Sequence, residues 1–253
     1  MTLRGGAYIL FCQPYNDVFD GLIEQYREAI EAIGGESQNW HQLGSPDSRL
    51  AEHLMMEYSW GHIDWERPPG LMARFYAKAD PKLRGWALEF VGRSLRDDAG
   101  EILPEVLERL KGLWAKRLEL VRNSGTASAE SEELRSFAWW FACKQFDDDW
   151  AMNQLREALQ IAGKTRFDFL IAERLAELSP QMPARTVECL SMMVEGDREG
   201  SDILGWQEHA RTILSVAVEL GDLQARTLAV ELIHRLGARG HPEFADLLPT
   251  KAE

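Results

Sequence analysis

One group of histidines and carboxylates in the chain has a spacing that could bind a metal ion. His53 and Glu57 lie four residues apart, one helical turn, and His62 follows five residues later. A histidine and a carboxylate at this spacing can share a metal ion, but the sequence lacks the HExxH arrangement that places two histidines on one helix face. The spacing therefore favours a histidine pair on the surface or at an interface, and we predict no metal site.

Groups that could act as nucleophiles or acids lack the surroundings that catalysis needs. Cys143 and Cys189 lie in apolar helical stripes, where a thiol is inert. Residues 147–149 are three aspartates before Trp150 at a predicted helix start, where unpaired backbone N–H groups stabilise carboxylates. The sequence has no GxSxG nucleophile turn, no GxxxxGKS/T phosphate loop and no GxGxxG turn. We therefore predict no cofactor and no enzymatic activity. A third hypothesis is an enzyme whose site is assembled across helices, and it predicts a deep pocket with converging histidines and carboxylates.

The residues best suited to bind a partner are aromatic and cationic. Trp139 and Trp140 are consecutive, so on a helix their side chains point about 100° apart and only one can occupy the centre of an apolar face. The other ring either packs between neighbouring helices or lines a partner-binding groove. Lys116 and Arg117 lie on a cationic helix that forms either a solvated surface or a small groove for an acidic peptide. We predict these four residues as contacts for a protein or peptide partner.

The composition indicates a globular protein of a reducing compartment. The 253 residues are 45% hydrophobic and 9% aromatic, which supplies more apolar surface than a disordered chain carries. The net charge of −13 argues against non-specific nucleic-acid binding, although residues 71–125 form a basic island with a net charge of +3. Three scattered cysteines, no secretory signal and no apolar run of about 18 residues predict a cytoplasmic protein without a membrane span.

Apolar residues recur at helical spacing through most of the chain. They follow the i, i+3, i+4, i+7 pattern of amphipathic helices, and a short apolar run at residues 6–13 would have no sheet to join. The sequence therefore predicts an all-α protein. We expect helices over residues 18–33, 50–58, 81–95, 104–121, 132–145, 149–162, 167–178, 183–194, 206–220 and 222–237.

Residues 34–70 are the least regular part, with three tryptophans and three histidines. Pro68 and Pro69 mark the expected boundary between an irregular, mostly helical N-terminal cap, residues 1–68, and a helical-repeat domain, residues 69–253. The loop at residues 125–131 is an alternative joint, because its small polar residues cannot bury a core.

Two predicted helices share a pattern at identical offsets, 142 residues apart. An aspartate at a helix N-terminus accepts from free backbone N–H groups, and an arginine one turn later can pair with an aspartate on the same or a neighbouring helix. The copies are Asp80, Arg84, Ala87, Glu89, Arg93 and Asp222, Arg226, Ala229, Glu231, Arg235. This pattern resembles the second helix of HEAT-type repeats, and the separation equals between three and four units of about 40 residues. The resemblance implies an α–α superhelix of HEAT- or armadillo-like helical pairs, with an irregular helical bundle as the alternative.

Stacked helical pairs leave an extended surface that solenoid proteins use to bind other proteins or peptides. We therefore expect a non-catalytic protein–protein interaction or scaffold module. Residues 229–248 also resemble the helical C-terminal region of large bacterial NTPase- and SIR2-type proteins of phage defence. That resemblance implies an alternative, a sensor segment that works with an effector on another chain or in a missing N-terminal part.

Overall fold

The computed structural model describes residues 46–63, 65, 71–97, 102–124, 130–197, 200 and 202–248. These residues form α-helices and short 3-10 helices (η) without any strand, which confirms the all-α prediction. The elements are α4 (Pro46–Ser59), α5 (Leu71–Lys78), α6 (Pro81–Asp97), α7 (Pro104–Ser124), η1 (Glu130–Ser136), α8 (Phe137–Ala142), α9 (Asp148–Ala162), α10 (Asp168–Leu178), α11 (Pro183–Gly196), η2 (Asp202–Gly205), α12 (Gln207–Glu219), α13 (Leu223–Ala238) and η3 (Pro242–Leu247). The predicted helix at 18–33, the apolar run at 6–13 and the expected boundary at Pro68 and Pro69 lie outside the described residues.

Helix ends follow local chemistry that the sequence predicts. α6, α7 and α9 to α13 begin and end within three residues of their predicted bounds. Asp80, Asp147 and Asp222 cap α6, α9 and α13, and the Oδ1 of each accepts the backbone N–H three residues later, at 2.8, 2.9 and 2.8 Å. The predicted capping roles of these three aspartates are therefore confirmed.

Two segments differ from the prediction. The helix expected at 132–145 is a 3-10 turn followed by the short α8, and it ends before Lys144, whose φ of 62° lies in the left-handed region. α5 is not among the predicted helices, because its eight residues are fewer than the roughly 11 over which helical spacing can be recognised.

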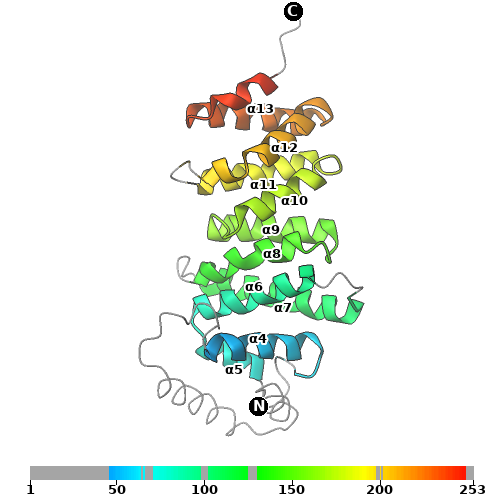
Figure 1. Ribbon diagram of the computed structural model, residues 1–253, viewed down its shortest axis with the longest axis vertical. Helices are drawn as coiled ribbons and strands as arrows, with labels where there is room; N and C mark the ends of the chain where they lie inside the picture. The colour runs from blue at the N-terminus through cyan, green and yellow to red at the C-terminus, as the bar shows by residue number, and fades with distance from the viewer. Residues whose placement is uncertain are drawn as a thin grey trace, which may run out of the picture.

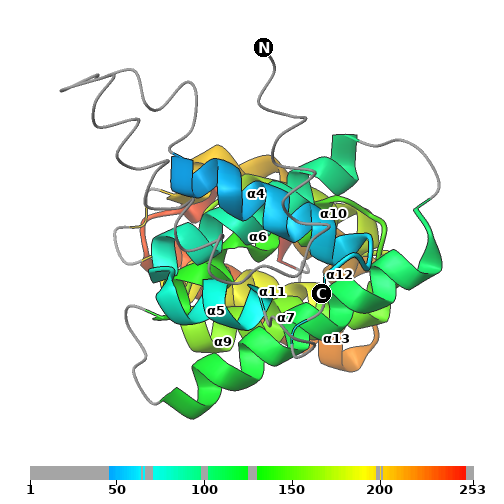
Figure 2. The same ribbon diagram turned by 90° about the horizontal axis from the view of Figure 1, so that it is seen from below.

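The helices stack in chain order along the long axis, from α4 and α5 at one end to α13 at the other (Figure 1). α6 packs against η1 and α8, α8 against α10, and α10 against α12; separately, α9 packs against α11 and α11 against α13. We call α6, η1–α8, α10 and α12 the even row, and α7, α9, α11 and α13 the odd row. Seen along the stack, α4 and α6 lie on one side and α7, α9 and α13 on the other (Figure 2).

Neighbours within a row run parallel. In the even row, Arg84 pairs with Glu133, and the Trp140 indole N–H donates to the Leu88 carbonyl at 2.6 Å, so residue numbers on α6 and η1–α8 rise together. The odd row does the same through the pairs Asp149–Arg185 and Arg156–Glu188. Each helix pair therefore returns the chain to the same direction.

The two helices that share the repeated aspartate–arginine pattern lie in different rows, α6 in the even row and α13 in the odd row. The pattern therefore does not mark equivalent positions of a repeat. Its arginines share a local role instead: Arg84 Nη1 donates to the Tyr76 carbonyl at 3.2 Å and Arg226 Nε to the Val218 carbonyl at 3.0 Å, each eight residues back. The pattern marks a short turn between two helices, which the aspartate caps and the arginine closes.

The core between the rows changes along the stack. In the N-terminal half, α4 to α9, it is aromatic, and the ring centroids of Trp114 and Phe137 lie 4.4 Å apart. In the C-terminal half, α10 to η3, Leu, Ile and Ala dominate. The fully buried alanines of that half are Ala172, Ala210, Ala217, Ala225 and Ala229. Since interaxial distance depends on the side chains at the contact, small residues let these helices approach closely.

Candidate partner-binding surface

The four predicted contact residues fall into two groups. Trp140 and Arg117 lie in the interior, 1% and 4% exposed, whereas Trp139 and Lys116 are half-buried. Trp140 stacks on Phe146 with ring centroids 5.5 Å apart. Trp140 and Arg117 are therefore not available to a partner in this conformation, and we leave them out of the candidate surface.

Trp139 lies among other aromatic and cationic side chains. The Arg96 guanidinium carbon, from α6, lies 5.7 Å from the centroid of the Trp139 ring. The centroid of the Phe167 ring, at the start of α10, lies 5.4 Å from that of Trp139. Phe169, 49% exposed, extends the group, with its ring 6.4 Å from that of Phe167. We call Arg93, Arg96, Trp139, Phe167 and Phe169 the aromatic–arginine face. It crosses three successive elements of the even row, α6, α8 and the start of α10.

A glycine allows α6 to reach this face. A Cβ on Gly92 would lie 2.6 Å from the Trp139 Cβ and 2.8 Å from the Trp140 backbone nitrogen. Any side chain here would push α6 and α8 apart. Gly92 therefore sets the depth at which Trp139 sits between Arg96 and Phe167.

Carboxylates lie between the arginines of the face but hold them loosely. Glu89 is buried, 3.8 Å from Arg93 Nε and 3.7 Å from Arg166 Nη1. Burial raises the pKa of Glu89, and the two arginines only partly oppose that shift. Arg96 Nη2 lies 3.8 Å from Glu173. These three distances exceed those of hydrogen bonds.

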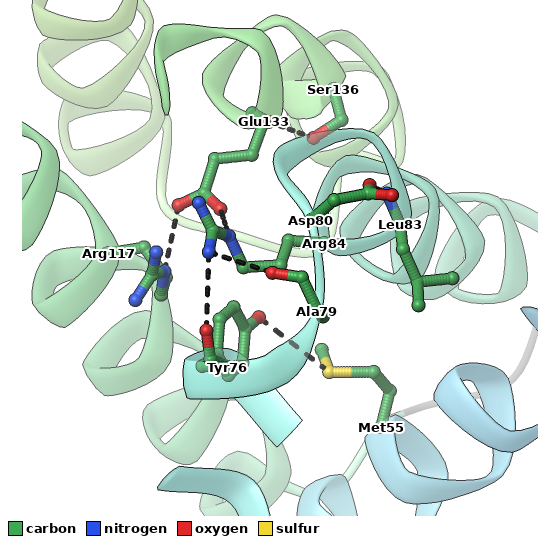
Figure 3. Close-up of polar contacts among 9 residues, drawn as sticks. All are labelled: Met55, Tyr76, Ala79, Asp80, Leu83, Arg84, Arg117, Glu133 and Ser136. Atoms are coloured by element: carbon green, nitrogen blue, oxygen red, sulfur yellow. Dashed lines mark hydrogen bonds and ion pairs between the residues drawn. The ribbon is translucent and has the colours of Figure 1, made fainter. Parts of the chain in front are cut away.

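A tight network of ion pairs lies in the core beside α6, the helix that carries Arg93 and Arg96 (Figure 3). The fully buried Glu133 accepts from Arg84 Nε at 2.7 Å and from Arg117 Nε at 2.8 Å, and so joins η1 to α6 and α7. Arg84 Nη1 also donates to the Tyr76 and Ala79 carbonyls, at 3.2 and 3.0 Å. Charge-assisted hydrogen bonds of this length are strong, and the network fixes three helices in register.

This network explains the position of Arg117. Its guanidinium carbon lies 4.3 Å from the Tyr76 ring centroid, beside the buried carboxylate, so it packs in the core. Burial, and next the charge of Glu133, raise the pKa of Tyr76 far above its ordinary value. Glu133 was not a candidate in the sequence. The signal that could have found it is its place four residues before Phe137 and seven before Trp140, on one apolar stripe.

The other cations of α7 are engaged within the molecule. Lys116 Nζ lies 4.5 Å from the Trp65 ring centroid, and Lys111 pairs with Glu108 at 2.8 Å. Arg122 pairs with Glu157 of α9. The structure does not bring Lys116 to Trp139, since α7 and α8 belong to different rows.

The candidate nucleophiles are buried thiols, and the candidate metal ligands lie on and just after α4. Burial raises the pKa of Cys143 to about 11 and that of Cys189 to about 12, so both thiols are protonated near neutral pH. His62 Nδ1 lies 2.8 Å from Glu57 Oε2, and the His53 side chain lies outside what the structure describes. Within the described ranges, no three His, Cys, Asp or Glu side chains gather as a metal site requires.

A cleft of about 750 Å³ lies where α9 and α11 end. Its charged lining residues are Arg135, Lys164, Glu195, Asp197 and Asp202. The Asp197 carboxylate is already used, since it accepts the backbone N–H groups of Gly200 and Asp202 at 2.8 and 2.9 Å. The lining has both signs of charge and contains neither histidine nor cysteine.

None of the helices in the described part of the chain combines the length and the apolarity that a bilayer crossing requires. Comparison with protein-family models, with curated proteins and with solved structures finds no match to this chain.

Proposed function

We propose that the protein is a non-catalytic protein–protein interaction or scaffold module that binds its partner through the aromatic–arginine face. The observation that carries the proposal is a chain of ring contacts: the exposed Phe169 ring lies beside the half-buried Phe167, Phe167 contacts the half-buried Trp139, and Arg96 lies against the Trp139 ring. Single exposed apolar residues are common on proteins, whereas a group that crosses three elements marks an interaction site. Aromatic residues and arginine are also the types that supply most interface binding energy.

We infer further that the two rows form an α–α solenoid of HEAT-like helical pairs. The odd-row helices α9, α11 and α13 begin at residues 148, 183 and 223, that is 35 and then 40 residues apart. Periods of this size are typical of helical-repeat families. Units that pack mainly on their neighbours leave an extended surface for a partner, and the aromatic–arginine face crosses successive units as such a surface would.

Two further parts of the proposal concern organisation and location. We propose a repeat domain from residue 69 and an N-terminal cap before it; α4, from the cap side, packs against α6 and α7. The three scattered cysteines support a reducing, cytoplasmic compartment, because an odd and dispersed set does not suit a disulfide framework.

Affinity capture of the tagged full chain from a lysate of its host, followed by quantitative mass spectrometry, tests the function. The test variant carries Phe169→Ser and Arg96→Ala, two partly exposed positions on the face. Leu223→Ser is the matched control, since Leu223 is 82% exposed and lies on α13, the last helix of the stack, away from the face.

We expect a partner at fixed stoichiometry with the native chain and the control, and at least about tenfold less with the double variant. Equal capture by all three chains would contradict the proposed surface. Failure of the native chain to retain any protein would contradict the scaffold function itself. Circular dichroism of each variant checks that its helices are intact.

A further inference from the structure

We propose that the partner segment bound at the aromatic–arginine face is an acidic, extended peptide. Its carboxylates would pair with Arg93 and Arg96, and an apolar side chain between them would pack on Phe169, Phe167 and Trp139. This inference rests on the proposed function and adds the chemistry of the partner.

The arrangement of the face suits a short segment that crosses the helices. Arg93 and Arg96 lie three residues apart on one face of α6, whereas Phe169 lies at the start of α10, with α8 between them. Packed helices lie about 8–10 Å apart, so the face spans roughly 16–20 Å. At about 3.3 Å per residue, five or six residues of extended chain reach from the arginines to Phe169.

The two arginines of the face are partly exposed and hold their present partners at long distances. The Arg93 and Arg96 side chains are 34% and 38% exposed, and each lies 3.8 Å from its glutamate. The Arg93 guanidinium carbon also lies 5.0 Å from the Trp86 ring centroid. Arg84, by contrast, holds Glu133 at 2.7 Å in the core. The Arg96–Glu173 pair is partly exposed and contributes little, so an incoming carboxylate gains a bidentate contact with Arg96 at small loss, whereas Arg93 also has to balance the buried Glu89.

Charge favours an acidic partner here and disfavours it elsewhere. The face takes both its α6 arginines from the basic island of residues 71–125, net charge +3, within a chain of net charge −13. An acidic segment is therefore attracted to this face and repelled by most of the remaining surface, which fixes its position. Nucleic acid is disfavoured, because a phosphate backbone would extend beyond the face over a chain of net charge −13.

The test is a selection of random 12-residue peptides displayed on phage against the immobilised full chain, with counter-selection on an Arg93→Ala, Arg96→Ala variant. Affinities of the selected peptides are then measured by fluorescence anisotropy, together with analogues in which each Asp is Asn and each Glu is Gln. Arg185→Ala is the control, because Arg185 pairs with Asp149 in the odd row, away from the face.

We expect selected peptides with at least two acidic residues around an aromatic or aliphatic one. The amide analogues and the double-alanine variant should each bind at least about tenfold more weakly, and Arg185→Ala should bind as the native chain does. Raising NaCl from 50 to 500 mM should weaken the acidic peptides, because salt screens the pairs.

Three outcomes would overturn the proposal. Neutral or basic selected peptides, or amide analogues that bind as tightly as the acidic peptides, would reject an acidic partner. If Phe169→Ser abolished binding of those peptides, the proposed function would still stand. Selection of no common sequence would reject a peptide ligand and leave the capture experiment to decide on the scaffold. A single-stranded oligonucleotide that binds this face when the acidic peptides do not would identify nucleic acid as the ligand.

Discussion

The two halves of the stack hold their rows together by different means. The N-terminal half uses large rings and buried charges; the buried charged residues there are Glu52, Glu57, Arg84, Glu89, Arg117 and Glu133. The C-terminal half has a mostly aliphatic core with few rings and keeps most of its ion pairs at the surface. The comparison teaches that similar helix packing can depend on specific long-range pairs in one region and on regular local periodicity in another.

This difference has energetic consequences. Removing one partner of a buried ion network leaves an uncompensated charge in the core, whereas an exposed pair contributes little to folding. We therefore expect single substitutions to have large effects in the N-terminal half and small ones at the surface pairs of the C-terminal half. The aromatic–arginine face lies where the halves meet, on α6, α8 and the start of α10.

The largest effect is expected from Glu133→Gln. The amide keeps the shape of the carboxylate but leaves Arg84 and Arg117 buried against a neutral group. The free energy of unfolding should fall by about 3 to 5 kcal/mol. Urea unfolding followed by tryptophan fluorescence measures this, because Trp114 and Trp140 are buried in the same half.

Glu195→Gln in the C-terminal half is the matched control, since Glu195 is an exposed partner of Arg235. It should change the free energy of unfolding by less than about 1 kcal/mol. Equal losses for the two glutamine variants would remove the energetic distinction between the halves.

The next effect concerns how closely α6 and α8 approach. Gly92→Ala places a Cβ 2.6 Å from the Trp139 Cβ and against the backbone of Trp139 and Trp140, which cannot move freely, and should destabilise the fold by about 2 kcal/mol. Gly112→Ala on α7 is the control, because nothing lies within 4 Å of its added Cβ. That control should gain about 0.5 to 1 kcal/mol from helix propensity, and thermal unfolding by circular dichroism measures both. A neutral Gly92→Ala would show that the helices separate easily at this point.

The same contrast explains how much of the fold the sequence reveals. In the C-terminal half, α11 to α13 were predicted closely, because their apolar spacing and their flanking Pro183, Asp222 and Gly221 are local signals. The split of η1 from α8 was missed, since it depends on Glu133 reaching two arginines that are distant in sequence. Spacing along one helix cannot show which neighbour a charged side chain will meet.

The candidate site shows the same limit. The sequence predicted that only one of the consecutive Trp139 and Trp140 rings could occupy the centre of an apolar face. Which of them is buried depends on Gly92 and on the Leu88 carbonyl of α6, which accepts the Trp140 indole N–H. Phe169 is the second residue of α10 and is 49% exposed, but nothing in the local sequence indicates that this ring faces solvent. The order of helices in the stack brings Phe167, and with it Phe169, to Trp139, and no single segment of the sequence specifies this order.

A smaller effect, of opposite sign, is expected from Glu89→Gln. Burial raises the pKa of Glu89, so the folded state takes up its proton at a higher pH than the unfolded state does. In the native chain this group therefore adds stability as the pH falls through its folded pKa, and it opposes folding near neutral pH. The variant should be between zero and about 1 kcal/mol more stable at pH 7.

The advantage of Glu89→Gln should disappear below the ordinary glutamate pKa of about 4.5, where the native carboxyl is also protonated in both states. Urea titrations at pH 7, 5.5 and 4 measure the trend. A loss of stability at pH 7 as large as that of Glu133→Gln would show that Arg93 and Arg166 bind Glu89 as tightly as the core network binds its carboxylate.

The smallest effect should come from Arg235→Ala in the C-terminal half. Arg235 reaches from α13 to Glu195 and, through Nη2, to the Ser191 hydroxyl at 2.8 Å, but both charged partners are exposed. Water replaces these contacts when the side chain is removed, and Arg239 still joins α13 to the Val194 and Asp197 carbonyls of the neighbouring segment. The free energy of unfolding should fall by less than about 0.5 kcal/mol, and the difference should vanish in 0.5 M NaCl. A loss above about 2 kcal/mol that persists in salt would mean that surface pairs, and not the packing of small side chains, hold α11 to α13.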